Sequence, residues 1–147
     1  ITFLQRDLTS PDWDATLPNQ GYDLACSFAA LHHIPSQPLR LQILKKIARL
    51  LKNQGLFFHS NWQFLNSPRL KSRVQSWQTV GLDPRDVDPG DYLLDWRRGG
   101  NGLRYVHLFD EAELLNLAEA TGFTVCETFH SDGEGGRLGL YQIWEIK

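Results

Sequence analysis

The sequence contains no methionine and has two cysteines, Cys26 and Cys126, among its 147 residues. Two distant thiols, each inside an apolar run, exclude a disulfide-rich scaffold and indicate buried cysteines in a reducing, cytoplasmic compartment. The net charge of −2 excludes a general attraction to nucleic acid or to anionic membranes, so a polyanion would need a local patch. No apolar run approaches the ~20 residues that cross a bilayer, and the opening residues show no signal-peptide pattern.

The opening of the chain also lacks the polar lead-in that usually precedes a first structural element. An apolar run extends from Ile1 to Asp7 and predicts a strand over Thr2–Arg6. Because no methionine precedes this run, we expect the sequence to be the C-terminal part of a longer protein. With 41% hydrophobic residues, the chain is still long enough for one domain with its own core.

Short apolar strands alternate with amphipathic helices over most of the chain. After the opening run, strands are predicted over Tyr22–Phe28, Leu56–Ser60, Phe123–Phe129 and Leu140–Ile146. The glycine-rich stretch 131–139 between the last two strands is suited to a hairpin loop. This order predicts a three-layer α/β sheet that closes with an antiparallel hairpin.

Two helices are predicted between these strands. The first covers Pro38–Leu51, with Ser36 as its N-cap, and the second begins at Asp110 and ends at Gly122. In the first helix, apolar residues at helical spacing predict a buried face, and basic residues predict an exposed one. The buried face consists of Ile43, Leu44, Ile47, Leu50 and Leu51, and the exposed face of Arg40, Lys45, Lys46 and Arg49.

A long segment at about 62–109 separates the third of these strands from the second helix. A loop of this length without structure of its own is uncommon, so we expect an inserted lid or substrate-binding segment within a single domain, 1–147. Basic residues alternate there with aromatic ones, a pattern that can hold a nucleic-acid backbone. Five aspartates in the same segment dilute that pattern, and a lid packed over a cleft explains the composition equally well.

The most informative stretch is Gly21–Ile34, an apolar strand followed by small residues and two adjacent histidines. The strand Tyr22–Phe28 is predicted to be buried, because apolar side chains continue through it. Its end, Ser27–Ala30, lies where open α/β sheets bind ligands. His32 and His33 point in different directions on a turning backbone, so no metal is expected. One imidazole can line the substrate side of a pocket and exchange a proton, while the other packs structurally.

Four stretches carry a resemblance to a known family. They are Phe3–Leu8, Tyr22–Ile34, Leu50–Gly55 with the strand that follows it, and Ala118–Val125. They resemble the third strand, the fourth motif, the fifth strand and the approach to the sixth strand of class I S-adenosylmethionine (SAM) dependent methyltransferases. The double histidine and Arg104–Phe109 resemble the branch that methylates modified wobble uridines in tRNA.

The resemblance implies a Rossmann-like methyltransferase sheet, SAM as the cofactor and a tRNA or small-molecule acceptor. The position of the double histidine makes His33 and His32 the candidate catalytic residues, with a role expected for at least one of them. The resemblance also implies cofactor contacts from Asp7, Leu8, Ser27, Phe28 and Ala29, and substrate contacts from Arg97, Arg98, Arg104 and His107. A protein partner is a further possibility that the sequence leaves open.

Two parts of the family pattern are absent from this sequence: the glycine-rich loop after the first strand and the acidic residue after the second. The glycine cluster Gly133–Gly139 lies between the last two strands and cannot replace that loop. We therefore expect this chain to bind SAM weakly or undetectably, and SAM to be the cofactor of the complete protein. The alternative hypothesis is a catalytically inactive, truncated fold that binds a partner.

Overall fold

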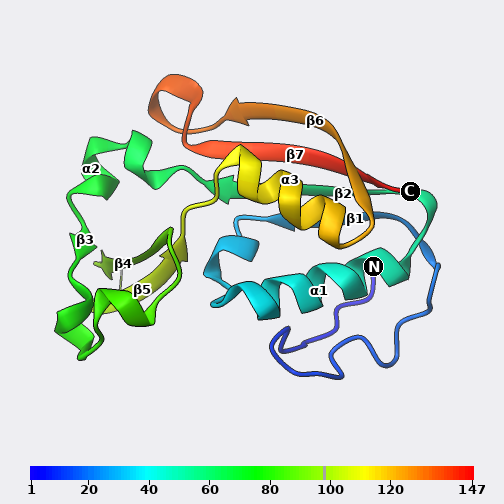
Figure 1. Cartoon of the computed structure of the whole chain (residues 1–147), viewed down its shortest axis with the longest axis horizontal. Coiled ribbons are helices and arrows are strands. Elements are labelled where there is room, and N and C mark those ends of the chain that lie inside the picture. Colours follow the sequence, from blue (N-terminus) through cyan, green and yellow to red (C-terminus); the bar gives the residue numbers. More distant parts are fainter. Residues whose placement is uncertain (98) are drawn as a thin grey trace.

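The computed structural model describes residues 1–97 and 99–147, with only the backbone of Glu134. A four-stranded mixed sheet with the order β1-β2-β7-β6 forms the body of the protein (Figure 1). β1 (Tyr22–Phe28) runs parallel to β2 (Leu51–Trp62), and β7 (Gly139–Ile146) is antiparallel to β2 and to β6 (Phe123–Ser131). The predicted strands after the opening run are therefore confirmed, as is the closing antiparallel hairpin.

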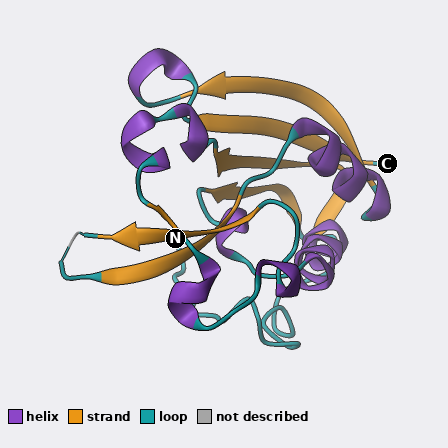
Figure 2. Cartoon of the chain, turned by 60° about the vertical axis from the view of Figure 1, so that its left-hand side comes forward, coloured by secondary structure: helices purple, strands orange, loops and turns teal. Residues whose placement is uncertain are grey.

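Both longer helices, α1 (Gln37–Leu50) and α3 (Glu111–Ala120), cover the same face of this sheet (Figures 1 and 2). Leu44 of α1 and Leu114 of α3 meet Phe57 and Trp144 of the sheet in one buried cluster. Apolar residues at helical spacing drive this packing, because each buried side chain contributes about 1.5–3 kcal/mol. The described residues thus form two layers of the predicted α/β architecture, the sheet and one helical layer.

The opposite face of the sheet is apolar and exposed near β1. Leu24 and Phe28 of β1 are 53% and 51% exposed, and Leu56 of β2, the partner of Leu24, is also exposed. The prediction that Tyr22–Phe28 is buried is wrong, because β1 is an edge strand that, among the described residues, pairs only with β2. The prediction of buried thiols is also wrong: Cys26 and Cys126 are both exposed, so burial no longer supports the argument for a reducing compartment.

The predicted strand over Thr2–Arg6 does not form. These residues are exposed and join no ladder among the described residues. A strand requires a hydrogen-bonded neighbour, because each residue of an isolated extended chain leaves its backbone N–H and C=O groups to water. Residues 1–20 instead run as turns and irregular chain past α1 and the outer edge of β1.

Helix boundaries agree with the prediction to within about two residues, but the burial of one side chain differs from the prediction. Arg40, predicted to be exposed, is 1% exposed and lies between α1 and the segment that follows β2. Ser36 is the N-cap residue of α1, yet it is Asp88 Oδ2 that accepts the hydrogen bond of the Gln37 N–H, at 3.0 Å. In α3 the predicted start at Asp110 is confirmed, since Asp110 is the N-cap and its Oδ1 accepts from the Glu113 N–H at 2.7 Å.

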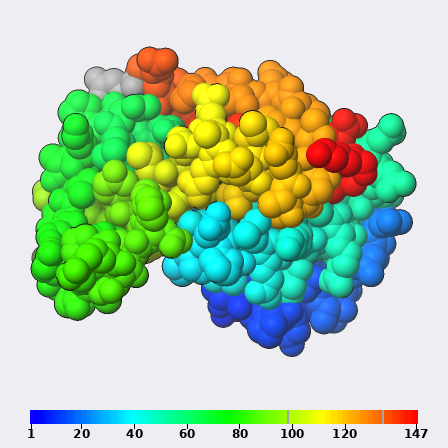
Figure 3. Space-filling view, in the orientation of Figure 1, coloured from blue at the N-terminus to red at the C-terminus, as the bar shows by residue number. Residues whose placement is uncertain are grey.

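The segment at 62–109 combines short helical turns with a second, three-stranded antiparallel sheet, β3-β4-β5. Figure 3 shows it as the green lobe beside α1 and α3. Phe64, Leu94 and Val106 form its own small core. Its strands are β3 (Val74–Gln75), β4 (Asp91–Trp96) and β5 (Gly102–His107), and its helical turns are η2 (Phe64–Asn66), α2 (Pro68–Lys71), η3 (Trp77–Val80) and η4 (Pro84–Asp86). A role as a lid stays a prediction.

Candidate functional site

The carboxyl ends of the parallel strands β1 and β2 meet at one edge of the main sheet. β1 ends at Phe28 and β2 at Trp62, and the short helix η1 (Leu31–His33) follows β1 directly. Ala29, between them, has a left-handed backbone with φ of 51°, and its N–H donates to the Ser60 carbonyl at 3.1 Å. The ligand-binding residues were predicted from the sequence to lie at this edge.

His33 presents one ring nitrogen to the protein. Its Nδ1 lies 2.9 Å from the Tyr105 carbonyl oxygen of β5. Because a carbonyl can only accept, Nδ1 carries the hydrogen, and the lone pair of a neutral ring is then on Nε2. Partial burial lowers the pKa of His33, and the nearby Arg104 guanidinium lowers it further. His33 is therefore suited to accept a proton or a hydrogen bond through Nε2.

His32 has a structural environment instead. Its ring is fully buried and stacks on Trp62 with centroids 5.3 Å apart, and its Nδ1 accepts from the Trp62 N–H at 3.3 Å. Burial lowers the pKa of His32 to about 3, so the ring is neutral near pH 7. It holds the end of β2 against η1, and of the two histidines only His33 has a geometry suited to chemistry.

Buried polar atoms continue from His32 along β2. His59 and Asn61 are both fully buried, and Asn61 Nδ2 lies 3.1 Å from His59 Nδ1. Among the described residues, His32 Nε2, His59 Nε2 and Asn61 Oδ1 have no hydrogen-bond partner. Burial lowers the pKa of His59 to about 3, as it does for His32. Both rings are therefore part of the core in their neutral form.

These two histidines should make the fold acid-labile. In the unfolded chain they titrate near 6.5, whereas in the fold their pKa is about 3, so the unfolded state binds protons first as the pH falls. Stability should decline continuously below about pH 6.5, by about 2 kcal/mol per histidine between pH 7 and pH 5. Urea unfolding at the two pH values measures this. His59→Gln should remove about half of the difference, and an unchanged pH dependence in that variant would contradict the assignment.

The predicted substrate-binding arginines are engaged with neighbours in the second sheet. Arg97 forms an exposed ion pair with Asp95 at 2.6 Å. The Arg104 guanidinium lies over two indole rings, 3.6 Å from the centroid of Trp96 and 5.9 Å from that of Trp62. Arg98 lies outside the described residues. Of these residues, the structure brings Arg104 to the edge beside His33 and Trp62.

His107, also predicted to bind substrate, lies in a buried network behind the edge. Its Nδ1 is 2.6 Å from Asp91 Oδ1 and its Nε2 is 2.9 Å from Glu113 Oε1. Asp91 also accepts from the Tyr105 hydroxyl at 2.6 Å, and that hydroxyl accepts from Arg40 at 3.1 Å. The network joins α1, α3 and the second sheet, and His107 lines neither of the cavities described next.

Two cavities open at the carboxyl edge. The first, which we call the edge cavity, has a volume of about 740 Å³ and runs along the outer edge of β1, between residues 2–17 and α1. The second, the aromatic cavity, has a volume of about 220 Å³ and lies between the end of β1 and the β6–β7 hairpin. It is lined by Phe28, Ala29, Ser60, Trp62, Asp132, Leu138, Gly139 and Tyr141. Phe28 lines both cavities.

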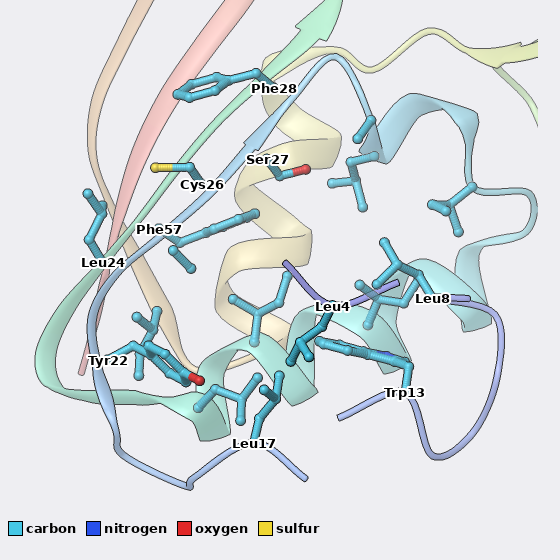
Figure 4. Close-up of a pocket in the computed structure, with 18 of the residues that line it drawn as sticks. Leu4, Leu8, Trp13, Leu17, Tyr22, Leu24, Cys26, Ser27, Phe28 and Phe57 are labelled. Carbon is cyan, nitrogen blue, oxygen red and sulfur yellow. The ribbon is translucent and has the colours of Figure 1, made fainter. Parts of the chain in front are cut away.

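Most of the predicted cofactor-binding residues line these cavities. Leu8, Ser27 and Phe28 line the edge cavity (Figure 4), and Phe28 and Ala29 line the aromatic cavity. The structure thus brings Leu8 next to the end of β1 across 20 residues of chain. Asp7 is exposed and its Oδ1 accepts from the N–H and the hydroxyl of Thr9, at 2.9 and 2.7 Å. These hydrogen bonds lower the pKa of Asp7 and keep it ionised.

Four residues with polar or aromatic side chains line the aromatic cavity but were not predicted from the sequence: Ser60, Trp62, Asp132 and Tyr141. Ligand-binding residues are expected at the carboxyl ends of parallel strands, and this rule applies to β2 as well as to β1, because both strands end at this edge. Ser60 and Trp62 were therefore accessible to prediction. Tyr141 lies directly opposite Ser60 in the β2–β7 ladder. The sequence alone does not determine the register of these two strands, so this pairing could not be predicted.

A family model described as a methyltransferase domain matches residues 2–128 of this chain. The chain belongs to the methyltransferase domain family. A protein of Encephalitozoon cuniculi (strain GB-M1) that is named a methyltransferase is 28% identical to this methyltransferase domain over 107 residues. That match covers 73% of this chain and 47% of the relative.

Solved structures show the same fold. A SAM-dependent methyltransferase from Methanosarcina mazei aligns with a TM-score of 0.69 at 20% identity, over 96% of this chain and 65% of that one. The 1,6-didemethyltoxoflavin-N1-methyltransferase of Burkholderia thailandensis, with bound 1,6-didemethyltoxoflavin and S-adenosylhomocysteine, aligns with a TM-score of 0.58 at 20% identity, over 88% and 46%. The fold is the Rossmann-like fold of these enzymes, and the chain spans about half to two thirds of their lengths.

Two classes of feature are not found in the part of the chain that the structure describes. No helix there is both long and apolar enough to cross a bilayer. No group of three or more histidine, cysteine or acidic side chains is arranged there to hold a metal ion.

Proposed function

We propose that the protein carrying this sequence transfers a methyl group from SAM to a small organic acceptor at the carboxyl edge of β1 and β2. The single observation that carries the proposal is that one residue at the end of β1, Phe28, lines both the edge cavity and the aromatic cavity, in a chain of the methyltransferase family. A methyl donor and an acceptor held in the two cavities would approach each other beside the end of β1.

The residues of the edge cavity suit the flat, weakly polar part of the cofactor. Leu8 and Phe28 offer apolar surface and Ser27 offers a hydroxyl group, and Asp7, which does not line the cavity, precedes Leu8 in the sequence. An adenine ring needs this combination of apolar walls and one hydrogen-bond acceptor for its amino group. SAM supplies an electrophilic methyl group on its sulfonium. The remaining task of the protein is to hold the acceptor in line and to keep water out.

His33 lines neither cavity, but its ring centroid lies 5.9 Å from that of Trp62, which lines the aromatic cavity, and His33 is the group that we propose to take a proton from an acceptor there. Its Nδ1–H is fixed on the Tyr105 carbonyl, and its lowered pKa leaves Nε2 unprotonated near neutral pH. An acceptor with an N–H or O–H group must lose that proton as the methyl bond forms. An acceptor that is already anionic, such as a carboxylate, would need no such base.

A small acceptor is favoured over RNA because the basic residues near the site already contact other side chains. Arg97 is paired with Asp95, Arg104 is stacked on Trp96 and Trp62, and no lysine, arginine or histidine lines the aromatic cavity among the described residues. Phosphate contacts usually come from basic side chains that remain available. Methylation of a tRNA uridine stays a prediction that rests on sequence resemblance, and the Burkholderia relative is named for a small-molecule acceptor.

Calorimetric titration with SAM tests the proposal. We expect the 147-residue chain to bind weakly or undetectably, because its sequence has no glycine-rich loop to hold the methionine part of SAM. We expect the natural protein that carries this sequence to bind SAM, and Asp7→Asn to weaken binding by roughly tenfold, the effect of losing one hydrogen bond at a charged acceptor.

Asp83→Asn is the matched control, because Asp83 is an exposed aspartate that likewise caps a local turn, η4, in the segment at 62–109. Natural protein that fails to bind SAM would favour the inactive, partner-binding alternative. An Asp7→Asn variant with the dissociation constant of the control would remove Asp7 from the cofactor site.

A further inference from the structure

The aromatic cavity has one acidic side chain and no basic one among the described residues that line it. Asp132 is at the tip of the β6–β7 hairpin, and its Oδ2 accepts the hydroxyl proton of Tyr141. Its Oδ1 receives no hydrogen bond from the described residues. That oxygen is thus available to a ligand that brings a donor.

The ring of Tyr141 is fixed in place rather than loosely exposed. It stacks on Phe129 with centroids 5.2 Å apart and an interplanar angle of 7°. It also packs against Gly139, where an added Cβ would lie 2.6 Å from Tyr141 Cε2. Glycine at this position therefore makes room for the ring, and the hydrogen bond to Asp132 fixes its outer end. Asp132 raises the pKa of Tyr141, so the phenol remains a donor.

Phe28 and Trp62 also line the aromatic cavity. Phe28 is half exposed, and its ring meets Phe58 edge-on at 5.0 Å. Aromatic walls favour flat ligands, and the Phe28 ring favours cations through its negative face, whereas the Trp62 ring already contacts Arg104 and His32. At about 220 Å³ the cavity is smaller than the sites that hold drug-sized molecules, so it suits one or two fused rings.

We propose that the aromatic cavity binds a small planar ring with an amino group or a positive charge, and that Asp132 selects this ligand by accepting its hydrogen. The inference rests on the proposed function, because it names the chemical class of the methyl acceptor. The same carboxylate disfavours anionic rings, since no basic side chain in the cavity offsets their charge. Tyr141 acts as a positioning residue that orients the Asp132 carboxylate.

Equilibrium dialysis of the 147-residue chain with two probes of equal size tests this proposal. 4-Aminoquinoline is a planar cation at neutral pH, and 1-naphthoate is a planar anion. We expect measurable binding of 4-aminoquinoline and no saturable binding of 1-naphthoate. Asp132→Asn should weaken 4-aminoquinoline binding by at least tenfold, as expected when a charge-assisted hydrogen bond is lost. Tyr141→Phe keeps the stacked ring and should cause a smaller loss.

Asp23→Asn is the control for net charge, because Asp23 is an exposed aspartate at the opposite end of β1, paired with Lys52. Equal losses in the Asp132 and Asp23 variants, or equal affinities for the two probes, would overturn the proposal. The measurement requires no SAM. Probe binding that depends on Asp132 would therefore support the inference even if the natural protein transferred no methyl group, whereas methyl transfer to an anionic ring would refute it and leave the proposed function intact.

Discussion

Replacement of Arg40 by methionine should lower the free energy of unfolding by about 2–4 kcal/mol. The Arg40 guanidinium is buried and donates to the Ile34 carbonyl and the Tyr105 hydroxyl, both at 3.1 Å. It also lies 3.4 Å from Asp88 and 3.8 Å from Glu113. Methionine fills most of the volume but leaves both carboxylates without their cation. Because Asp88 and Glu113 are partly hydrated, the loss should stay below that of a fully buried pair.

Arg85→Met is the matched control for this measurement. Arg85 pairs with Asp83 on the surface, with side-chain exposures of 88% and 44%, and exposed pairs contribute about 0–1 kcal/mol. Urea denaturation followed by circular dichroism gives both values. If Arg40→Met is no more destabilising than Arg85→Met, the network around His107 does not hold the second sheet against the helices.

His33→Ala should lower kcat of the natural protein about 100-fold, a typical contribution of a proton acceptor. The variant removes the Nε2 lone pair at the carboxyl edge and the hydrogen bond to the Tyr105 carbonyl. The affinity for SAM should not change, because His33 lines neither the edge cavity nor the aromatic cavity. Radiolabelled methyl transfer, together with calorimetry for SAM, measures both quantities.

The pH profile separates proton transfer from a structural role of His33. In the parent protein kcat should rise with pH through the lowered pKa of His33 and then level off, whereas in His33→Ala that rise should be absent. His130→Ala, at an exposed position on β6, controls for the loss of an imidazole elsewhere. A His33→Ala variant with full kcat, or with the parent's acidic limb, would assign the proton transfer to another group.

The periodicity of apolar residues was sufficient to predict most of the main sheet and both long helices. It failed where pairing decides the outcome: residues 2–6 have strand composition but no neighbouring strand, and β1 is apolar yet lies at an edge. Helical spacing could not reveal that Arg40 is buried. It lies on the side of α1 that would face water, and residues far along the chain cover it: Asp88 and Tyr105, which follow 48 and 65 positions later, and Glu113 of α3.

The candidate site shows the same division. His33, Phe28 and Ala29 were predictable because they follow one strand at the ligand-binding edge. Asp132 and Tyr141 come from the far end of the sequence and reach this edge through the β2–β7 register and the β6–β7 hairpin. Arg104 and His107 are three residues apart on β5, yet one stacks on indole rings beside the edge and the other is buried between carboxylates. The residue types alone did not indicate which of the two side chains would be buried and which would lie at the edge.

The unpaired outer edge of β1 bears on how the chain behaves at high concentration. Tyr22–Phe28 presents backbone donors and acceptors without a partner among the described residues, beside the exposed side chains of Leu24 and Phe28. Such an edge is a template for β-aggregation, and Asp23 is the single charged residue on the strand that opposes it. A net charge of −2 adds little colloidal repulsion. The same strand that ends at the candidate site is therefore a place where copies of the chain can pair at high concentration.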